Sequence, residues 1–208
     1  MKHRTLKDFE RFAEKKNVQA LFRREQLSEG GKYEEFVTQL YEDIDAAIYR
    51  LQASREFRQH DSEDRITKDI LISLEQHGYF ATHDSKTGGH VDLAVQLGSH
   101  SWIAEAKKNG GLNEGFLQLT TRYVQASGNF AHDHVGLLCY LVDVKDALRM
   151  LNGWRSKLSE RGCACRECDK NRLAFYSQHT LPGSGTTVTL RTMVVSLYHE
   201  PEDRSARR

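Results

Sequence analysis

The sequence predicts a mixed α/β fold, in which helices cover a β-sheet and a helical segment precedes it. Three observations support this class. Apolar residues follow a 3.6-residue period in the first quarter of the chain. Short apolar runs with glycines between them come next, and helical patterns then alternate with such runs. The middle of the chain therefore has the order helix, three strands, helix, strand, helix.

Four helical patterns can be located. The apolar positions between Tyr33 and Leu51 form a broad face that must be buried. Ile66, Ile70 and Leu74 are spaced by four residues, and Gly78 suits a left-handed helix end. We expect helices over residues 5–55, from Ser62 to His77, from a cap at Asn113 to Ala126, and over 143–158.

Strand patterns occupy most of the remaining chain. Their apolar runs are short and are rich in valine, leucine and aromatic residues. We expect strands over residues 78–84, 91–97, 102–108, 134–144, 172–178 and 186–199.

These patterns divide the chain into three parts. Residues 1–60 are expected to form a helical extension that clamps substrate, mediates a homodimer or docks a partner protein. Residues 61–200 form the main domain, with a cysteine-rich loop at 162–170, and residues 201–208 form a disordered tail.

Composition narrows the class of protein. The 208 residues carry a net charge of +1, with 28% charged and 38% apolar residues, so a nucleic-acid site would have to be a local patch. No apolar run approaches the roughly 18 residues that span a bilayer, so no membrane association is expected. The N-terminus is too polar for a secretory signal, and four cysteines without one indicate a cytoplasmic location.

Charged residues interrupt two of the expected strands. If these strands form an antiparallel hairpin turning at Gly98–Ser101, Asp92 lies opposite or nearly opposite Lys107, and Glu105 is one diagonal step away. A register shift by an even number of residues keeps Asp92 on the same face. Two carboxylates held together are costly unless a positive charge lies between them. Mg²⁺ fits, because it prefers carboxylate oxygens. In the alternative interpretation, these charges form the solvated side of a half-exposed hairpin.

Asp92, followed thirteen residues later by Glu105-Ala106-Lys107, resembles the D…(D/E)-x-K signature of the PD-(D/E)XK nuclease superfamily, which has the restriction-endonuclease-like fold. The order of elements between Ser62 and Val144 is also similar. Val91 stands where the signature has a proline, which is not a metal ligand. Gly88 and Gly89 precede the Asp92 strand and would let a backbone approach a ligand.

The resemblance implies a role for each matching residue. Asp92, Glu105 and the backbone carbonyl of Ala106 would hold Mg²⁺ or Mn²⁺. Lys107 would orient or deprotonate the attacking water, or stabilise charge on the phosphate. Such a metal ion lowers the pKa of bound water and neutralises phosphate oxygens.

Helix residues would complete the site. Glu63 is the candidate acid of the preceding helix and metal ligand, because Ile66 and Ile70 place it on the inward face. Asp64 and Glu35 are its alternatives. Gln118 resembles the glutamine often found on the helix after the motif. Lysines and arginines around this site are candidate phosphate contacts, namely Lys68, Lys86, Lys108 and Arg122.

The implied function is a metal-dependent nuclease, most readily a DNA endonuclease that acts in restriction or anti-phage defence. Two alternatives stay open. One is an RNase, or a junction or repair nuclease, because the same residues act on any phosphodiester. The other is a non-catalytic nucleic-acid or protein-binding module on the same fold.

A second cluster contains three thiols. Cys163, Cys165 and Cys168 lie within six residues, and with His179, or alternatively His199, they could bind a structural Zn²⁺. The alternative is a redox-sensitive loop without metal. Cys139 lies in an apolar strand and is expected in the core.

Overall fold

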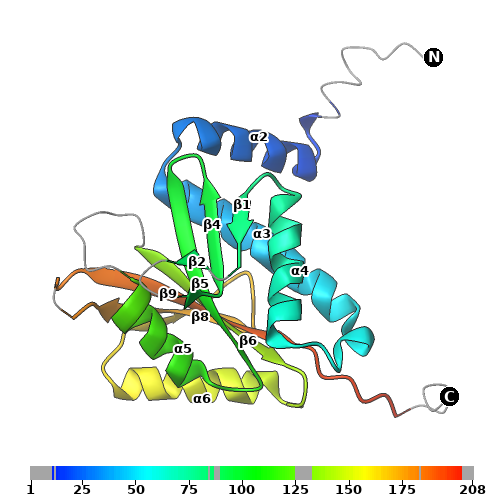
Figure 1. Cartoon of the computed structure of the whole chain (residues 1–208), viewed down its shortest axis with the longest axis vertical. Coiled ribbons are helices and arrows are strands. Elements are labelled where there is room, and N and C mark those ends of the chain that lie inside the picture. The colour runs from blue at the N-terminus through cyan, green and yellow to red at the C-terminus, as the bar shows by residue number, and fades with distance from the viewer. Residues whose placement is uncertain are drawn as a thin grey trace.

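The computed structural model of the chain describes residues 11, 13–83, 85–86, 90–124, 133–182 and 184–202, without the side chains of residues 85 and 86. The described residues form a mixed seven-stranded sheet with helices on both faces and an N-terminal helical part (Figure 1). The predicted mixed α/β class is therefore confirmed. Gly88, Gly89 and residues 203–208 of the predicted tail lie outside the described residues.

The helices appear close to where the apolar periods predict them. They are α2 (Lys16–Gly30), α3 (Tyr33–Ala53), the 3₁₀ turn η1 (Arg55–Arg58), α4 (Glu63–Glu75), α5 (Leu112–Gln118), the π-helix η2 (Leu119–Tyr123) and α6 (Ala147–Glu160). None of the helices in the described ranges is both long enough and apolar enough to span a bilayer.

The strands include three that the sequence did not predict as separate elements. The strands are β1 (Phe80–Thr82), β2 (Ser85–Lys86), β3 (His90–Val91), β4 (Leu93–Leu97), β5 (His100–Lys108), β6 (His134–Leu141), β7 (Cys165–Glu167), β8 (Ala174–Thr180) and β9 (Thr187–Ser196). β2 and β3 form a separate two-stranded ribbon. β7 lies in the cysteine-rich segment that was predicted to be a loop.

The large sheet has the order β1-β4-β5-β6-β9-β8-β7. β5, β6 and β9 run parallel at its centre, and antiparallel strands extend it on both sides. The apolar sequence of β6 agrees with a central strand that is buried on both faces.

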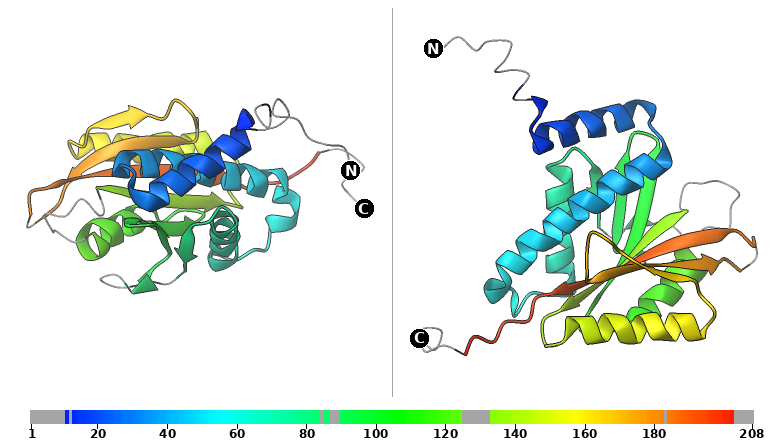
Figure 2. Two further views of the ribbon diagram at one scale, coloured as in Figure 1. Left: turned by 90° about the horizontal axis from the view of Figure 1, so that it is seen from above. Right: turned by 180° about the vertical axis from the view of Figure 1, so that it is seen from behind.

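Two hydrophobic cores lie on opposite faces of the sheet. Trp102 and Tyr140 point to the face covered by α3 and α4, and Figure 2 shows α3 crossing this face. Leu137 and Cys139 point to the other face, which is covered by α5, η2 and α6. Because α3 contributes Phe36 and other buried residues to the first core, the segment predicted as an extension also packs on the sheet.

The helical region predicted over residues 5–55 is divided at Gly30 and Gly31. Gly30 has a φ of +133°, and a Cβ on Gly31 would lie 2.5 Å from the side chain of Leu27. These glycines let the chain reverse, so that α2 packs against α3.

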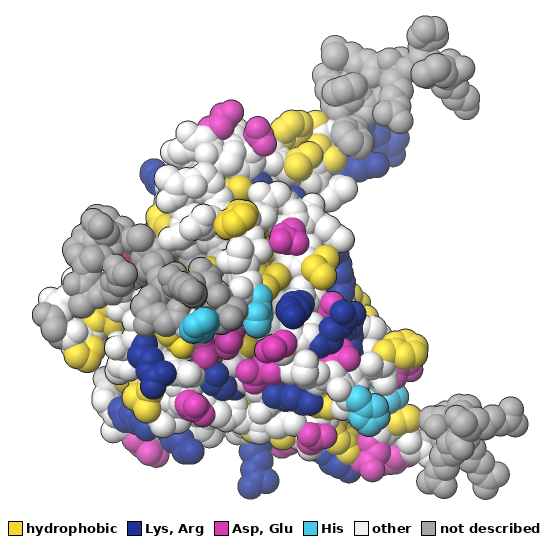
Figure 3. Space-filling view, in the orientation of Figure 1, with side chains coloured by type: hydrophobic (Ala, Val, Ile, Leu, Met, Phe, Trp, Pro, Cys, Tyr) yellow, Lys and Arg dark blue, Asp and Glu magenta, His cyan; other side chains and the backbone are white. Residues whose placement is uncertain are grey.

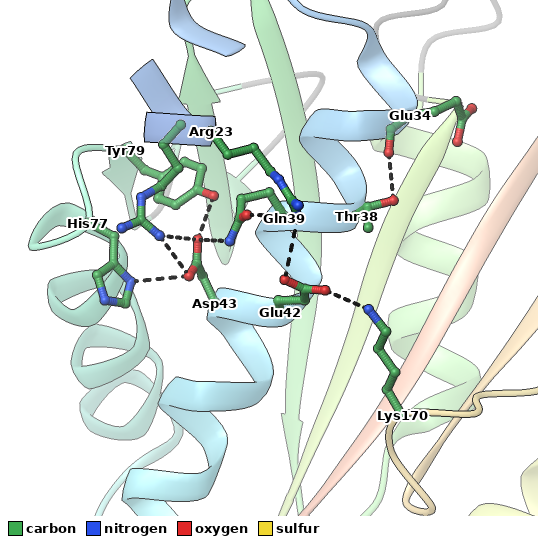
Figure 4. Close-up of polar contacts among 10 residues, drawn as sticks. Arg23, Glu34, Thr38, Gln39, Glu42, Asp43, His77, Tyr79 and Lys170 are labelled. Atoms are coloured by element: carbon green, nitrogen blue, oxygen red, sulfur yellow. Dashed lines mark hydrogen bonds and ion pairs between the residues drawn. The ribbon is translucent and has the colours of Figure 1, made fainter. Parts of the chain in front are cut away.

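A buried polar network joins α2 to α3 and to the start of β1. The Arg24 guanidinium donates to both Asp43 oxygens at 3.0 Å. The Tyr79 hydroxyl and the Gln39 amide donate to Asp43 at 2.8 and 3.2 Å (Figure 4). Arg24 and Asp43 are each 9% exposed, so removal of one partner would leave a buried charge without compensation.

A two-residue turn connects β4 to β5. Leu97 pairs with His100, so Gly98 and Ser99 alone form the turn. Gly98 has a φ of +56°, and a Cβ there would lie 2.3 Å from the Ser28 carbonyl oxygen of α2. The expected turn over Gly98–Ser101 was therefore two residues too long, because glycine makes the tighter turn accessible.

Replacing Gly98 by alanine is expected to lower the free energy of unfolding by about 2–3 kcal/mol, through backbone strain and collision with Ser28. Gly78→Ala is the matched control, because Gly78 also has a positive φ, of +90°, but nothing lies within 4 Å of its Cβ position. This control should cost about 1 kcal/mol. Urea unfolding measures both losses, and equal losses would contradict close packing of α2 on the turn.

Candidate active site at the end of the β4–β5 hairpin

The site begins at a break in the strand that the sequence predicted over residues 91–97. Asp92 lies between β3 and β4, in a bend. The pairing of Leu93 with Ala104 places Asp92 opposite Glu105, and not opposite Lys107 as expected. The shift is two residues, which keeps all three side chains on one face, as the alternation of a strand requires. The predicted hairpin is thus confirmed, with a corrected register.

Asp92 takes over the hydrogen bonding that β4 would otherwise provide. Its Oδ2 accepts the backbone N–H of Ala106 at 2.9 Å. Because the N–H and C=O of a strand residue point to the same side, the Ala106 carbonyl also faces the Asp92 side. The break in the strand thereby fixes one carboxylate beside one backbone oxygen.

Lys107 lies between the two strand carboxylates. Its Nζ is 2.6 Å from Oε1 of Glu105 and 3.9 Å from Oδ2 of Asp92. The Glu105 side chain is only 2% exposed. Its second oxygen, Oε2, is buried and has no hydrogen-bond partner among the described residues. A buried carboxylate oxygen without a partner is costly, and a cation would compensate for it.

Glu63, the first residue of α4, is brought to the same place. Its carboxylate is close enough to Lys107, to Asp92 and to the backbone of Lys108 for these groups to affect its pKa. The two alternative acids lie elsewhere. Asp64 is exposed, with its Oδ1 3.6 Å from Nε2 of His83, and Glu35 is exposed on α3. Of the two acids at the start of α4, Glu63 is thus the one that faces Lys107, and its role as a ligand stays a prediction.

The start of α4 is held against the end of β5. The Ser62 hydroxyl accepts the backbone N–H of Arg65 at 3.2 Å and caps the helix. The Lys108 ammonium donates to the Asp61 carbonyl at 2.7 Å. Lys108 thus contributes to positioning Glu63, in addition to any role as a phosphate contact.

α5 packs directly on the site through two glycines. A Cβ on Gly115 would lie 3.2 Å from Glu105 and 3.3 Å from Lys107, and a Cβ on Gly111 would lie 3.3 Å from Lys107. Asn113 does not cap this helix as expected. Gly111 occupies the cap position, and the Asn113 amide oxygen accepts from Arg161 at 2.8 Å.

The helix predicted over residues 113–126 is an α-helix only as far as Gln118. The Gln118 amide oxygen is buried and has no hydrogen-bond partner in the described part of the chain. From Leu119 to Tyr123 the backbone forms a π-helix, a conformation that is rare and often found at functional sites.

Tyr123 is a site residue that the sequence analysis missed. It is buried at the end of the π-helix. Burial and the charges of Glu105 and Asp92 raise the pKa of its phenol, so its hydroxyl lies within range of these charges. No motif marks Tyr123, although an aromatic residue one turn beyond Gln118 could have been considered.

The pKa shifts describe partly buried carboxylates around a single ammonium, that of Lys107. Burial raises the pKa of Glu105 to about 7, and the charge of Asp92 adds to this effect although the Lys107 hydrogen bond opposes it. Burial also raises the pKa of Glu63. Burial alone would lower the pKa of Lys107, but the Glu105 hydrogen bond and the charges of Glu105, Asp92 and Glu63 outweigh it and raise this pKa.

These oxygens suit a hard divalent cation. Mg²⁺ is commonly bound by one or two protein carboxylates together with water and substrate phosphate. Asp92, Glu105 and the Ala106 carbonyl offer such ligands, with Glu63 close by. Across the described ranges, no group of three or more His, Cys, Asp or Glu side chains is arranged to hold a metal. The site would therefore need water or substrate oxygens to complete the coordination.

The predicted phosphate contacts are spread around the site. Arg122 is exposed on η2 next to Tyr123, and Lys68 is exposed on α4. The side chain of Lys86 lies outside the described part of the structure. Figure 3 shows acidic side chains gathered on the face between α4 and α5, with basic side chains around them.

The predicted zinc ligands are only partly brought together. Sγ of Cys163 is 3.4 Å from Nδ1 of His179, and burial lowers the pKa of His179 to about 4. Cys165 is half-buried on the same side of the sheet. Cys168 belongs to the opposite core, where it contacts Arg191 at 3.5 Å. The three thiols do not lie on the same side of the sheet, so zinc binding by this segment stays a prediction.

Comparison with known families, with curated proteins and with solved structures finds no match to this chain.

Proposed function

We propose that the protein is a metal-dependent nuclease that hydrolyses phosphodiester bonds in nucleic acid, most readily a DNA endonuclease. The observation that carries this proposal is that Nζ of Lys107 lies 2.6 Å from Glu105 and 3.9 Å from Asp92, with Glu63 close enough for their charges to affect its pKa, and that Oε2 of Glu105 is buried without a partner within the described residues. A protein that only binds nucleic acid gains nothing from carboxylates placed beside phosphates, because like charges repel.

The arrangement of elements also supports the proposal. α4 precedes the antiparallel strands β1, β4 and β5, and α5 then connects β5 to the parallel strand β6. This is the order expected from the resemblance to the PD-(D/E)XK superfamily. The residues that resemble the superfamily signature, Asp92 and Glu105-Ala106-Lys107, lie at the end of the β4–β5 hairpin.

Asp92, Glu105 and the Ala106 carbonyl would hold the cation, with Glu63 as a further carboxylate. When bound, Mg²⁺ or Mn²⁺ would supply positive charge to phosphate oxygens and lower the pKa of a water molecule. The chain's own contribution is to fix these ligands. The Ala106 N–H orients Asp92, and the Lys108 ammonium, through the Asp61 carbonyl, holds the start of the helix that carries Glu63.

Lys107 is positioned for the roles that the resemblance implies. In the metal-free protein, the Glu105 hydrogen bond and the charges of Glu105, Asp92 and Glu63 raise its pKa. The side chain would orient or deprotonate the nucleophile, or stabilise the charge that grows on the phosphate. The buried stem between Gly111 and Gly115 limits the positions that its ammonium can reach.

The test is cleavage by the wild-type protein. We expect Mg²⁺ or Mn²⁺ to support cleavage of labelled DNA, and EDTA to abolish it, in a gel assay with single-stranded DNA, duplex DNA, branched DNA and RNA in parallel. Preferential cleavage of RNA or of branched DNA would favour the RNase or the junction nuclease instead. Binding without cleavage of any substrate would contradict the proposed activity and support the non-catalytic module.

A further inference from the structure

A groove of about 580 Å³ lies between α5 and α6, next to the candidate active site. Leu112, Met150 and Trp154 provide apolar surface in it, and Arg149 and Lys157 provide positive charge. Its volume is within the range of about 300–1,000 Å³ that is typical of ligand sites. Neither basic residue was among the predicted phosphate contacts.

Gly153 keeps this groove open. Arg149, Gly153 and Lys157 are spaced by four residues, so they share one face of α6. A glycine inside a helix costs about 1 kcal/mol relative to alanine. Packing does not require it here, because nothing lies within 4 Å of a Cβ built on Gly153. The lack of a side chain at Gly153 leaves a gap on the helix face between Arg149 and Lys157.

The groove adjoins the site around Lys107 at Gly111. Gly110 and Gly111, which follow β5, line the groove, and a Cβ on Gly111 would lie 3.3 Å from the Lys107 side chain. α5 and α6 cover the sheet face to which Glu105 and Lys107 point. A chain that leaves the site over Gly111 would therefore enter the groove.

The charge in the groove is mainly positive. One acidic residue, Asp146, lines the groove, but its carboxylate accepts the Arg149 backbone N–H at 2.8 Å and caps α6. Apolar surface beside two cations matches a nucleotide, which has an apolar base face and an anionic phosphate.

We propose that the α5–α6 groove binds a nucleotide of the substrate strand adjacent to the phosphate that is cut. This inference depends on the proposed function. Arg149 and Lys157 contact the strand's phosphates, and the base packs on Met150 and Trp154. These residues act in binding and do not touch the reacting atoms.

The test measures binding of a labelled single-stranded oligonucleotide in EDTA, where metal-dependent cleavage is absent. Removing both charges in the variant Arg149→Gln/Lys157→Gln is expected to weaken binding about tenfold and to reduce the slope of log K against log salt by about 1.4, which is about 0.7 per phosphate contact. Arg155→Gln is the matched control on the same helix, because Arg155 pairs with Glu167 at 2.9 Å. It should leave the slope unchanged.

Gly153 provides a second, independent variant. Gly153→Ala is expected to raise the melting temperature, because alanine favours the helix, and to weaken oligonucleotide binding by narrowing the groove. Gly153→Leu should weaken binding further. A loss of binding in a variant with raised melting temperature cannot be a folding defect.

The outcomes separate this inference from the proposed function. If the wild type cleaves nucleic acid, but the double variant and Gly153→Leu bind the oligonucleotide as well as the wild type, the proposed groove site is wrong. The proposed nuclease activity is then unaffected. Binding of a free mononucleotide in the groove, without competition from the oligonucleotide, would also overturn it. No cleavage of any substrate by the wild type, with groove-dependent oligonucleotide binding retained, would support the groove and contradict the proposed activity.

Discussion

Asp92→Asn is expected to lower Mg²⁺-dependent cleavage by about a thousandfold, because a bound metal ion contributes several kcal/mol to such a reaction. Asparagine retains an oxygen that can accept the Ala106 N–H, now at 2.9 Å from Asp92. The variant therefore removes the negative charge and keeps the local fold. Stability should change by about 1 kcal/mol or less. Single-turnover cleavage and thermal unfolding measure the two effects.

Neighbouring acids on α4 provide the control for this prediction. Glu63→Gln should also reduce cleavage, because Glu63 is close to Lys107 and Asp92. Asp64→Asn should not, because Asp64 is exposed and directed toward His83. Full activity of the Asp92 variant, or equal losses for the two helix acids, would contradict the assignment of the site.

The position of the site could be predicted from sequence, but its register could not. Alternation along two strands places Asp92, Glu105 and Lys107 on one face for any even register. The residue that faces Asp92 depends on the length of the turn at Gly98, and the sequence fits both a two-residue and a four-residue turn. The same pattern also hides the bend at Asp92, because Val91 and Leu93 are both apolar and suggest a continuous strand.

Among the helix residues, too, some positions could be predicted from the sequence and others could not. The spacing of Ile66 and Ile70 predicts that Glu63 lies on the inward side of the helix and Asp64 does not, because an α-helix has a fixed period. The period does not describe a π-helix, so the placement of Tyr123 could not be derived. In the cysteine segment, the spacing of three thiols says nothing about sheet faces, and β7 leads Cys168 into the core opposite Cys165.

Glu105 makes the stability of the metal-free protein depend on pH. Burial raises its pKa from 4.5 to about 7 in the folded protein. A carboxyl group whose pKa is raised by folding contributes its full stabilisation when the pH is below its pKa in the unfolded chain. This contribution is lost as the pH rises through its pKa in the folded protein. We expect the free energy of unfolding to fall by about 1–3 kcal/mol between pH 4.5 and pH 8 because of this residue.

The variant Glu105→Gln isolates this effect, because glutamine does not titrate but keeps an oxygen for the Lys107 ammonium, which lies 2.6 Å from Oε1. The pH dependence should flatten relative to the wild type, whereas Glu114→Gln, which removes an exposed acid on α5, should leave it unchanged. At pH 8, Mg²⁺ at ten times its dissociation constant should stabilise the wild type by about 1.4 kcal/mol and should not stabilise Glu105→Gln. Urea unfolding across this pH range, with and without Mg²⁺, measures both effects. Equal stabilisation of the two proteins by Mg²⁺ would show that Glu105 is not a ligand, whatever the cleavage assay finds.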